Sequence, residues 1–360
     1  MTADATARMS SYIKRIATGP KMSKDLNLQE ARDAMALILA GQADPVQAGV
    51  LLIALRMKRE TDEENFGVLE ALRASTRYAV ADVDELIDIA DPYDGFLRHL
   101  PAGPFLPALL AACGLPAVSH GCRTLGPKFG LTHHQILAAA GVKVDLTPQA
   151  AAACVADPRV GWAYVDQRAF HPALHGLAEL RRLIVKRPCL ATLEKFCGPL
   201  RARGKTHLIV GYVHAAYEEL LPKLARHAGF DSALVVRGIE GGVAPPLNAP
   251  SKLTTYRNAG PIATVRLAPR EADIESAQRS APPPDESTDV AQLAQDAARA
   301  GLAALDGAAG PLRDSLVLTA AAVLQHLGRA PSLHEAAALA RRAIDSGAAR
   351  QRFQAFSRNV

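Results

Sequence analysis

Apolar positions between residues 26 and 80 repeat with the three-to-four-residue spacing of amphipathic helices. Three helices are predicted there, and each opens after a side chain that can accept the first free backbone N–H groups: Asn27, Asp44 and Thr61. Gly41 is placed to end the first helix, because glycine tolerates the left-handed conformation that follows many helices. This part of the chain is therefore predicted to form a small helical unit.

From residue 86 onward, short apolar runs alternate with helical patterns. Strands are predicted at residues 86–89, 117–119, 163–165, 206–213, 232–237 and 261–267. Long Ala- and Leu-rich helices are predicted at residues 290–304 and 312–327. Strands that alternate with helices favour a mostly parallel sheet, which binds ligands at the carboxyl ends of its strands.

The predicted fold class is therefore α/β, with a small helical amino-terminal domain and a larger α/β domain built on a mostly parallel central sheet. We place the helical domain at residues 1–83, completed by helices from about residues 166–190, and the α/β domain at residues 84–360.

Composition narrows the class of protein. The chain has no run of 18 apolar residues, so no transmembrane span is expected. Its five cysteines are odd in number and lack metal-ligand spacing, which is typical of reduced thiols, and we expect a cytoplasmic protein. The formal net charge of +5 is modest, so its distribution along the chain is more informative than its size.

Residues 118–142 combine a short apolar run, a small-residue turn, a Gly- and Pro-rich loop and a helix. The turn carries His120, Gly121 and Arg123, the loop carries Lys128, and Thr132 is placed to cap the helix. Cations and free N–H groups at a helix start favour a phosphate site, and an ordinary strand–loop–helix connection is the alternative. At the start of the same helix, we expect residues 133 and 134, both histidine, to be a surface pair.

This stretch resembles the second phosphate-handling segment of anthranilate phosphoribosyltransferases, which has a K-H-G-N-R turn and a helix ending in L-E-A-L-G. His120, Gly121 and Arg123 match the turn, whereas Cys122 replaces its Asn. The resemblance extends over nearly the whole chain. It implies the nucleoside phosphorylase/phosphoribosyltransferase class, with the active site in the cleft between a helical and an α/β domain.

The resemblance also implies a G-T-G-G-D-G loop that wraps the pyrophosphate of phosphoribosyl pyrophosphate. Here the position reads Asp-Pro-Tyr-Asp-Gly, in which Asp94 and Gly95 match the end of the motif and Asp91 adds negative charge. The Asp-Glu pair that holds Mg²⁺ in that family is reduced to Glu240. These departures favour degenerate catalytic motifs, with Mg²⁺ as a cofactor only if the protein is a transferase.

Residues 159–227 carry 12 Lys and Arg against 5 Asp and Glu, a net charge of +7 that exceeds the +5 of the whole chain. Such a local excess is typical of surfaces that bind nucleic acid, and a solvated basic face is the alternative. The residues expected to contact phosphates are Arg181, Arg182, Lys186, Arg187, Arg201, Arg203 and Lys205. Aromatic residues of the same segment, Trp162, Tyr164 and Phe170, are expected in the core rather than stacked on bases.

Two hypotheses of different class follow. In the first, the protein binds DNA or RNA without sequence specificity, as implied by a resemblance to the divergent YbiB-type branch of the family, whose members are homodimeric. In the second, it is a glycosyl or phosphoribosyl transferase that uses a phosphorylated sugar such as phosphoribosyl pyrophosphate. The cleft residues are then Asp94, Gly95, His120, Gly121, Arg123 and Lys128, with Glu240 as the metal ligand.

Overall fold

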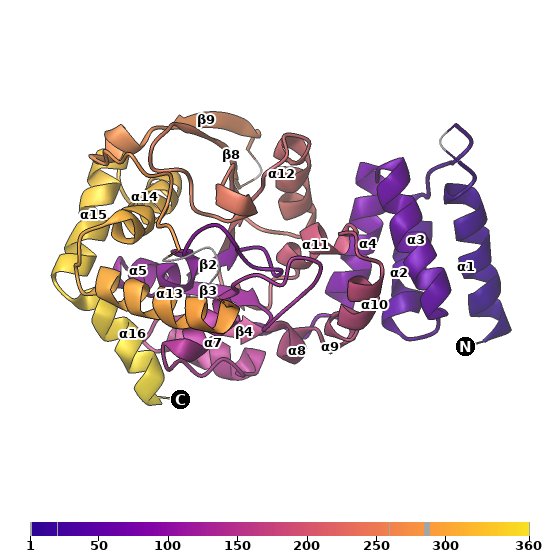
Figure 1. Ribbon diagram of the computed structural model, residues 1–360, viewed down its shortest axis with the longest axis horizontal. Helices are drawn as coiled ribbons and strands as arrows, with labels where there is room; N and C mark the ends of the chain where they lie inside the picture. Colours follow the sequence, from indigo (N-terminus) through magenta and orange to yellow (C-terminus); the bar gives the residue numbers. More distant parts are fainter. Residues whose placement is uncertain (1, 20, 259, 284–288, 360) are drawn as a thin grey trace.

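The computed structural model describes residues 2–19, 21–258, 260–283 and 289–359. A helical unit lies at one end of the molecule and a larger α/β body at the other (Figure 1). The helical unit contains α1 (Ala3–Ile16), α2 (Leu28–Leu39), α3 (Pro45–Lys58) and α4 (Asp62–Ala74). The three helices predicted from their caps are α2, α3 and α4, so that prediction is confirmed.

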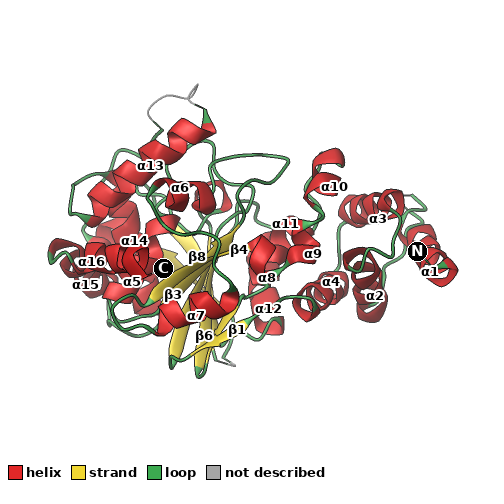
Figure 2. Cartoon of the chain, turned by 90° about the horizontal axis from the view of Figure 1, so that it is seen from below, coloured by secondary structure: helices red, strands yellow, loops and turns green. Residues whose placement is uncertain are grey.

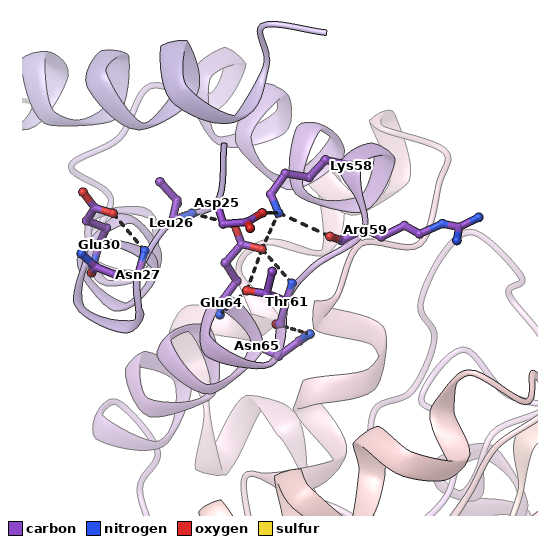
Figure 3. A network of polar contacts seen from close by, with 9 residues as sticks. All are labelled: Asp25, Leu26, Asn27, Glu30, Lys58, Arg59, Thr61, Glu64 and Asn65. Carbon is purple, nitrogen blue, oxygen red and sulfur yellow. Dashed lines mark hydrogen bonds and ion pairs between the residues drawn. The ribbon is translucent and has the colours of Figure 1, made fainter. Parts of the chain in front are cut away.

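Buried polar contacts hold the helical unit together where its helices begin and end (Figure 3). Thr61 caps α4 by accepting the backbone N–H of Glu64, a contact of a kind worth about 1 kcal/mol. The Glu64 carboxylate is fully buried, lies 2.7 Å from Lys58 Nζ, and accepts the backbone N–H of Leu26 at 2.9 Å. One carboxylate thus ties the end of α3, the start of α4 and the approach to α2 together.

The α/β body is built on a seven-stranded sheet (Figure 2). Its strands are β2 (Glu85–Ala90), β3 (Ala117–Gly121), β4 (Trp162–Asp166), β6 (Lys205–Gly211), β7 (Ser232–Val236), β8 (Ser251–Arg257) and β9 (Ala263–Leu267). The order is β4-β3-β2-β6-β7-β8-β9, parallel from β4 to β7 and antiparallel at β8 and β9. The predicted α/β class and mostly parallel sheet are confirmed.

Helices cover the sheet on both faces. The helices of the α/β body are α5 (Leu106–Ala112), α6 (His133–Ala139), α7 (Pro148–Ala156), α12 (Tyr217–His227), α13 (Val290–Leu305), α14 (Pro311–His326), α15 (Leu333–Asp345) and α16 (Ala348–Asn359). Trp162 of β4 stacks on Phe353 and Phe356 of α16, and Tyr164 and Phe170 are also fully buried, so the aromatic residues belong to the core as predicted.

Four short helices follow β4: α8 (Gln167–Phe170), α9 (Pro172–His175), α10 (Ala178–Leu183) and α11 (Leu190–Leu193). In this segment α10 packs against α3, and α11 packs against α4 (Figure 1). The chain then returns to the α/β body through β5 (Leu200–Ala202), which pairs with β1 (Ala79–Ala81). None of the helices in the described ranges is long and apolar enough to cross a bilayer.

Candidate active site

A cleft of about 460 Å³ lies between the helical unit and the α/β body. One wall is made by α3 through Arg56, and the floor is made by the segments that follow β2 and β6. The remaining wall comes from residues 187–195 and from Glu240. The cleft therefore lies at the carboxyl ends of parallel strands, the position at which such sheets bind ligands.

One ion pair across the cleft joins the loop after β2 to the segment before α11. Arg187 Nε lies 2.6 Å from Asp94 Oδ2, and its guanidinium stays half-exposed. The next residue, Gly95, has φ +77°, and a side chain there would lie 2.6 Å from the backbone of Gly130. Glycine is therefore required for this loop to close, and the sequence match at Asp94 and Gly95 has a structural reason.

A second ion pair joins Lys128 to Glu240. Lys128 Nζ lies 2.6 Å from Glu240 Oε2 and donates to the Gly95 carbonyl at 2.6 Å. The Glu240 carboxylate also accepts the backbone N–H groups of Leu97 at 3.0 Å and Arg98 at 2.6 Å. Burial alone would raise the pKa of Glu240, but these donors, with His99 and Lys128 foremost, hold its pKa well below its usual range. Glu240 is thus a firmly held anion.

A buried polar chain lies beneath the cleft. His120 Nε2 lies 2.7 Å from Asp88 Oδ1, and His120 Nδ1 hydrogen-bonds the Tyr93 hydroxyl. All three residues are almost completely buried, and Tyr93 lies in the cleft wall. His120 therefore orients Tyr93 and does not reach the cleft itself.

The other turn residues of the sequence prediction also lie outside the cleft. Gly121 is buried beside Tyr164, and Arg123 is exposed and does not belong to the cleft wall. Of the predicted cleft set, the structure brings Asp94 and Lys128 together in the wall, with Gly95 as the carbonyl partner of Lys128.

Two sequence-based expectations, one about the charge of Asp91 and one about the exposure of two histidines, are wrong. Asp91 does not present a free negative charge to the cleft, because it is buried, lies 2.6 Å from His133 Nε2 and accepts the Val243 backbone N–H at 2.7 Å. The histidines at the start of α6 are not a surface pair, because His134 Nδ1 lies 2.7 Å from the buried Asp166 carboxylate. Each ring lies against a carboxylate from a distant part of the chain, which neighbouring residues in the sequence could not reveal.

Lys195 was missed by sequence reasoning, although it is part of the cleft wall. It is buried and donates to the Gly211 carbonyl at 2.7 Å, where β6 ends. Burial lowers the pKa of Lys195 to about 8, although the nearby carboxylates of Asp91, Glu194 and Asp94 act to raise it. In the sequence it is one charged residue in a short helical run, with no signal that distinguishes it from a surface lysine.

The residues present do not by themselves fit a resident magnesium ion. Asp94 is paired with Arg187 and Glu240 is paired with Lys128, so neither carboxylate is free for a cation. Among the described residues, no group of three or more His, Cys, Asp and Glu side chains is placed to hold a metal ion. Magnesium usually binds substrate phosphates together with only one or two protein carboxylates.

The predicted nucleic-acid contacts do not form one surface. Arg181 is buried in a two-bond pair with Glu194, at 2.7 and 2.9 Å, so it is not available to a phosphate backbone. Arg187 is exposed in the cleft wall and Lys186 is exposed next to it in the chain, whereas Lys205 starts β6 at the end away from the cleft. At the usual rise per strand residue β6 is about 20 Å long, and its other end, Gly211, is the one that lies in the cleft wall.

The other predicted contacts are engaged within the chain. Arg182 pairs with Glu179, Arg203 pairs with Asp82, and Arg201 lies over the Phe230 ring. Arg182 and Arg203 remain exposed, so a phosphate could compete for them, whereas Arg201 is mostly covered.

Comparisons with known proteins agree over nearly the full chain. Residues 10–76 match a family model described as the helical bundle domain of a glycosyl transferase family, and residues 105–350 match the a/b domain of such a family. The anthranilate phosphoribosyltransferase of Rhodopseudomonas palustris strain HaA2 is 31% identical over 345 residues, which cover 96% of each chain. The enzyme of the same name from Thermomicrobium roseum is 31% identical over 349 residues, covering 96% of this chain and 95% of the relative.

Solved structures show the same fold. Anthranilate phosphoribosyltransferase from Thermus thermophilus superposes with a TM-score of 0.76 at 24% identity, covering 98% of this chain and 99% of the other. The Saccharomyces cerevisiae enzyme, in complex with phosphoribosyl pyrophosphate and magnesium, gives a TM-score of 0.75 at 15% identity and covers 97% of both chains.

Proposed function

The chain belongs to the anthranilate phosphoribosyltransferase-like glycosyl transferase family, and from that premise we propose that it transfers a phosphoribosyl or related glycosyl group from a phosphorylated sugar donor. The observation that carries the proposal is the convergence of cations on one cleft at the carboxyl ends of β2 and β6: Arg56, Arg98, Lys128, Arg187 and Lys195. Similarity to transferases over the full length favours this hypothesis over nucleic-acid binding.

The cleft residues suit a reaction in which an anionic group leaves a sugar carbon. Arg187 contacts Asp94 and Lys128 contacts the Gly95 carbonyl, so both cations lie at the loop after β2, where they can share the charge of a departing pyrophosphate. Lys195 adds a third cation that is held rigidly by burial and by the Gly211 carbonyl. Fixed charges of this kind stabilise a developing anion without reorganising at the moment of reaction.

The donor would bring the magnesium that the relatives' chemistry implies. The yeast relative was solved with phosphoribosyl pyrophosphate and magnesium, and magnesium usually binds substrate phosphates together with only one or two protein carboxylates. Asp94 and Glu240 would take part only after giving up Arg187 and Lys128, so we treat magnesium as part of the donor.

Isothermal titration calorimetry with phosphoribosyl pyrophosphate, with and without Mg²⁺, tests the proposal. We expect saturable, Mg²⁺-dependent binding of the donor to the full chain. The affinity of Arg187→Met for the donor should be at least tenfold weaker, because a hydrogen bond to a charged group contributes about 1.4 kcal/mol or more, and this energy corresponds to a tenfold change in affinity. Arg182→Met, which removes an equal charge outside the cleft, is the matched control. Pyrophosphate release with a panel of acceptors that includes anthranilate then measures transfer. Absence of binding at millimolar donor would contradict the proposal.

Exposed cations favour one second candidate, nucleic-acid binding without sequence specificity, as in the YbiB-type branch. Lys186, Arg203 and Lys205 are exposed within the segment of net charge +7. Fluorescence anisotropy with labelled single- and double-stranded oligonucleotides at two salt concentrations tests it. We expect binding that weakens steeply with salt, and a smaller salt slope for Lys186→Ala, because each phosphate contact contributes to that slope. Unchanged affinity and slope would remove Lys186 from the interface.

We also propose that the protein is a homodimer through its amino-terminal helices. On α3, Val46 is 74% exposed, Val50 is 42% exposed and Met57 is 75% exposed, and their spacing places them along one side of the helix. Light scattering coupled to size exclusion is expected to give twice the chain mass of 38.1 kDa, and Met57→Asp is expected to give the monomer. A monomeric wild-type chain would contradict this proposal.

A further inference from the structure

Glu240 occupies the best anion receptor in the cleft. Two successive backbone N–H groups, those of Leu97 and Arg98, point at its carboxylate, and Lys128 and His99 complete the set at 2.6 and 3.4 Å. The Glu240 side chain is only 10% exposed, so water scarcely competes for these donors. Consecutive amides together with an ammonium group form a receptor suited to the oxygens of a phosphoryl group or a carboxylate.

The backbone at Glu240 is held in an unfavourable conformation while it makes these contacts. Its φ is +51° and its ψ is 19°, which is the left-handed region that residues with a side chain rarely adopt. The residue sits in a single 3-10 turn, Ile239–Gly241, between Gly238 and Gly242. The carboxylate is therefore delivered to the receptor by a sharp turn whose backbone conformation is unusual for glutamate.

Both cations that flank the loop after β2 are paired in the same way. Lys128 is paired with Glu240, and Arg187 is paired with Asp94. A ligand with one anionic group would replace the Glu240 carboxylate at Lys128 by another anion, so the net gain in binding free energy would be small. A ligand with two linked anionic groups can replace both carboxylates and hold both cations at once.

We propose that Glu240 is an intramolecular competitor: it fills the receptor formed by the Leu97 and Arg98 amides, His99 and Lys128, and a pyrophosphoryl group binds by displacing it. This proposal deepens the proposed function and rests on it for the class of ligand. Glu240 thereby lowers the affinity of every anion that needs this receptor, and a ligand with two linked phosphoryl groups overcomes the competition because it also binds Arg187.

Calorimetric titration of inorganic pyrophosphate and inorganic phosphate into the full chain tests the proposal without requiring turnover. We expect Glu240→Gln to bind pyrophosphate about tenfold or more tightly than the wild type, since a competitor that occupies a site lowers apparent affinity by the fraction left free. Phosphate affinity is expected to rise by a similar factor, because both ligands have to displace the same carboxylate from the receptor. Glu240→Ala, which removes the carboxylate together with the rest of the side chain beyond Cβ, is also expected to bind both anions more tightly than the wild type.

Two variants separate displacement from a general change of charge. Glu60→Gln removes a carboxylate from the wall of the same cleft without touching the receptor, and it is expected to change pyrophosphate affinity by less than threefold. Lys128→Met combined with Glu240→Gln is expected to lose the gain. An equal gain in Glu60→Gln, or a gain that survives in the double variant, would overturn the proposal.

Failure of this proposal is distinguishable from failure of the proposed function. If wild-type protein binds phosphoribosyl pyrophosphate but Glu240→Gln gains no affinity for pyrophosphate, the competitor role is wrong and the transferase proposal stands. If Glu240→Gln gains affinity while the wild type neither binds the donor nor releases pyrophosphate from it, the receptor is real and the transferase proposal is wrong. Thermal unfolding of each variant verifies that the fold is retained, and the isosteric Gln variant decides the test if the Ala variant does not fold.

Discussion

Replacing Arg181 with methionine tests how α10 is attached to the segment between α11 and β5. The Arg181 guanidinium is 2% exposed and donates to both oxygens of the Glu194 carboxylate, which is 1% exposed. Methionine has similar length and fills the space, so the variant removes the charge while it largely preserves the packing. Among the described residues, Glu194 would keep the hydrogen bond from the Gln167 amide at 3.0 Å, but it would lose the cation that is paired with it directly.

Removing one partner from a buried ion pair costs about 3–5 kcal/mol, because the remaining charge has lost its solvation and its counter-ion. We expect Arg181→Met to lower the free energy of unfolding by that amount. Arg182→Met is the matched control: it removes the neighbouring arginine, whose pair with Glu179 is exposed, and exposed pairs of this kind contribute about 0–1 kcal/mol.

Urea denaturation followed by circular dichroism measures both variants and the double variant that combines Arg181→Met with Glu194→Gln. The double variant is expected to be more stable than Arg181→Met alone, because it no longer buries an unpaired charge. An Arg181→Met variant that keeps full stability but loses oligonucleotide affinity would refute this reasoning and restore Arg181 to a nucleic-acid interface.

Three further outcomes are expected. Gly301→Ala on α13 should lower the free energy of unfolding, measured by urea denaturation, by about 1–3 kcal/mol, because the added methyl group would lie 1.9 Å from the Phe105 ring. Alanine has the better helix propensity, so an increase in stability would contradict this packing. Phe356→Ala should lower the free energy of unfolding by about 3–5 kcal/mol and shift the fluorescence of Trp162, the only tryptophan in the sequence, to longer wavelength. Unchanged emission would count against the stacking of these two rings. Burial, the largest cause, lowers the pKa of His326 to about 3 in the folded protein, so the unfolded chain binds a proton at this residue more readily than the folded one. The contribution of His326 to stability is therefore complete above pH 6.5 and is lost as the pH falls from there toward 3. Between pH 7.5 and 5.5 this loss is about 1.3 kcal/mol, which His326→Gln should remove.

Much of the fold was predictable because its signals are local. Asn27 and Thr61 each form the capping contacts expected of them, and the predicted strands lie within a few residues of the observed ones. Strand β8 was not predicted, because it mixes exposed polar with buried residues, as at Lys252 and Leu253. Its antiparallel pairing with β7 joins segments whose relation no local pattern encodes.

The site was less predictable because its chemistry depends on partners far apart in the chain. Lys128 was identified from its loop, but its partner Glu240 is separated from it by more than a hundred residues. Asp91 was expected to repel an anion, and the structure supplies His133 to satisfy it. Arg181 looked like its exposed neighbours, because nothing in its own surroundings in the sequence reveals a buried Glu194.

The path of the chain between the two parts of the molecule limits how such a protein could be recombined. Residues 10–76 match a helical family model by themselves, yet α10, which packs against α3, comes from a segment that follows β4. A crossover near residue 76 would therefore join foreign helices to a native α10, and the new interface would have to be rebuilt. Homologous exchange of the helical unit preserves its packing only if two separate stretches of gene, encoding α1–α4 and α8–α11, move together.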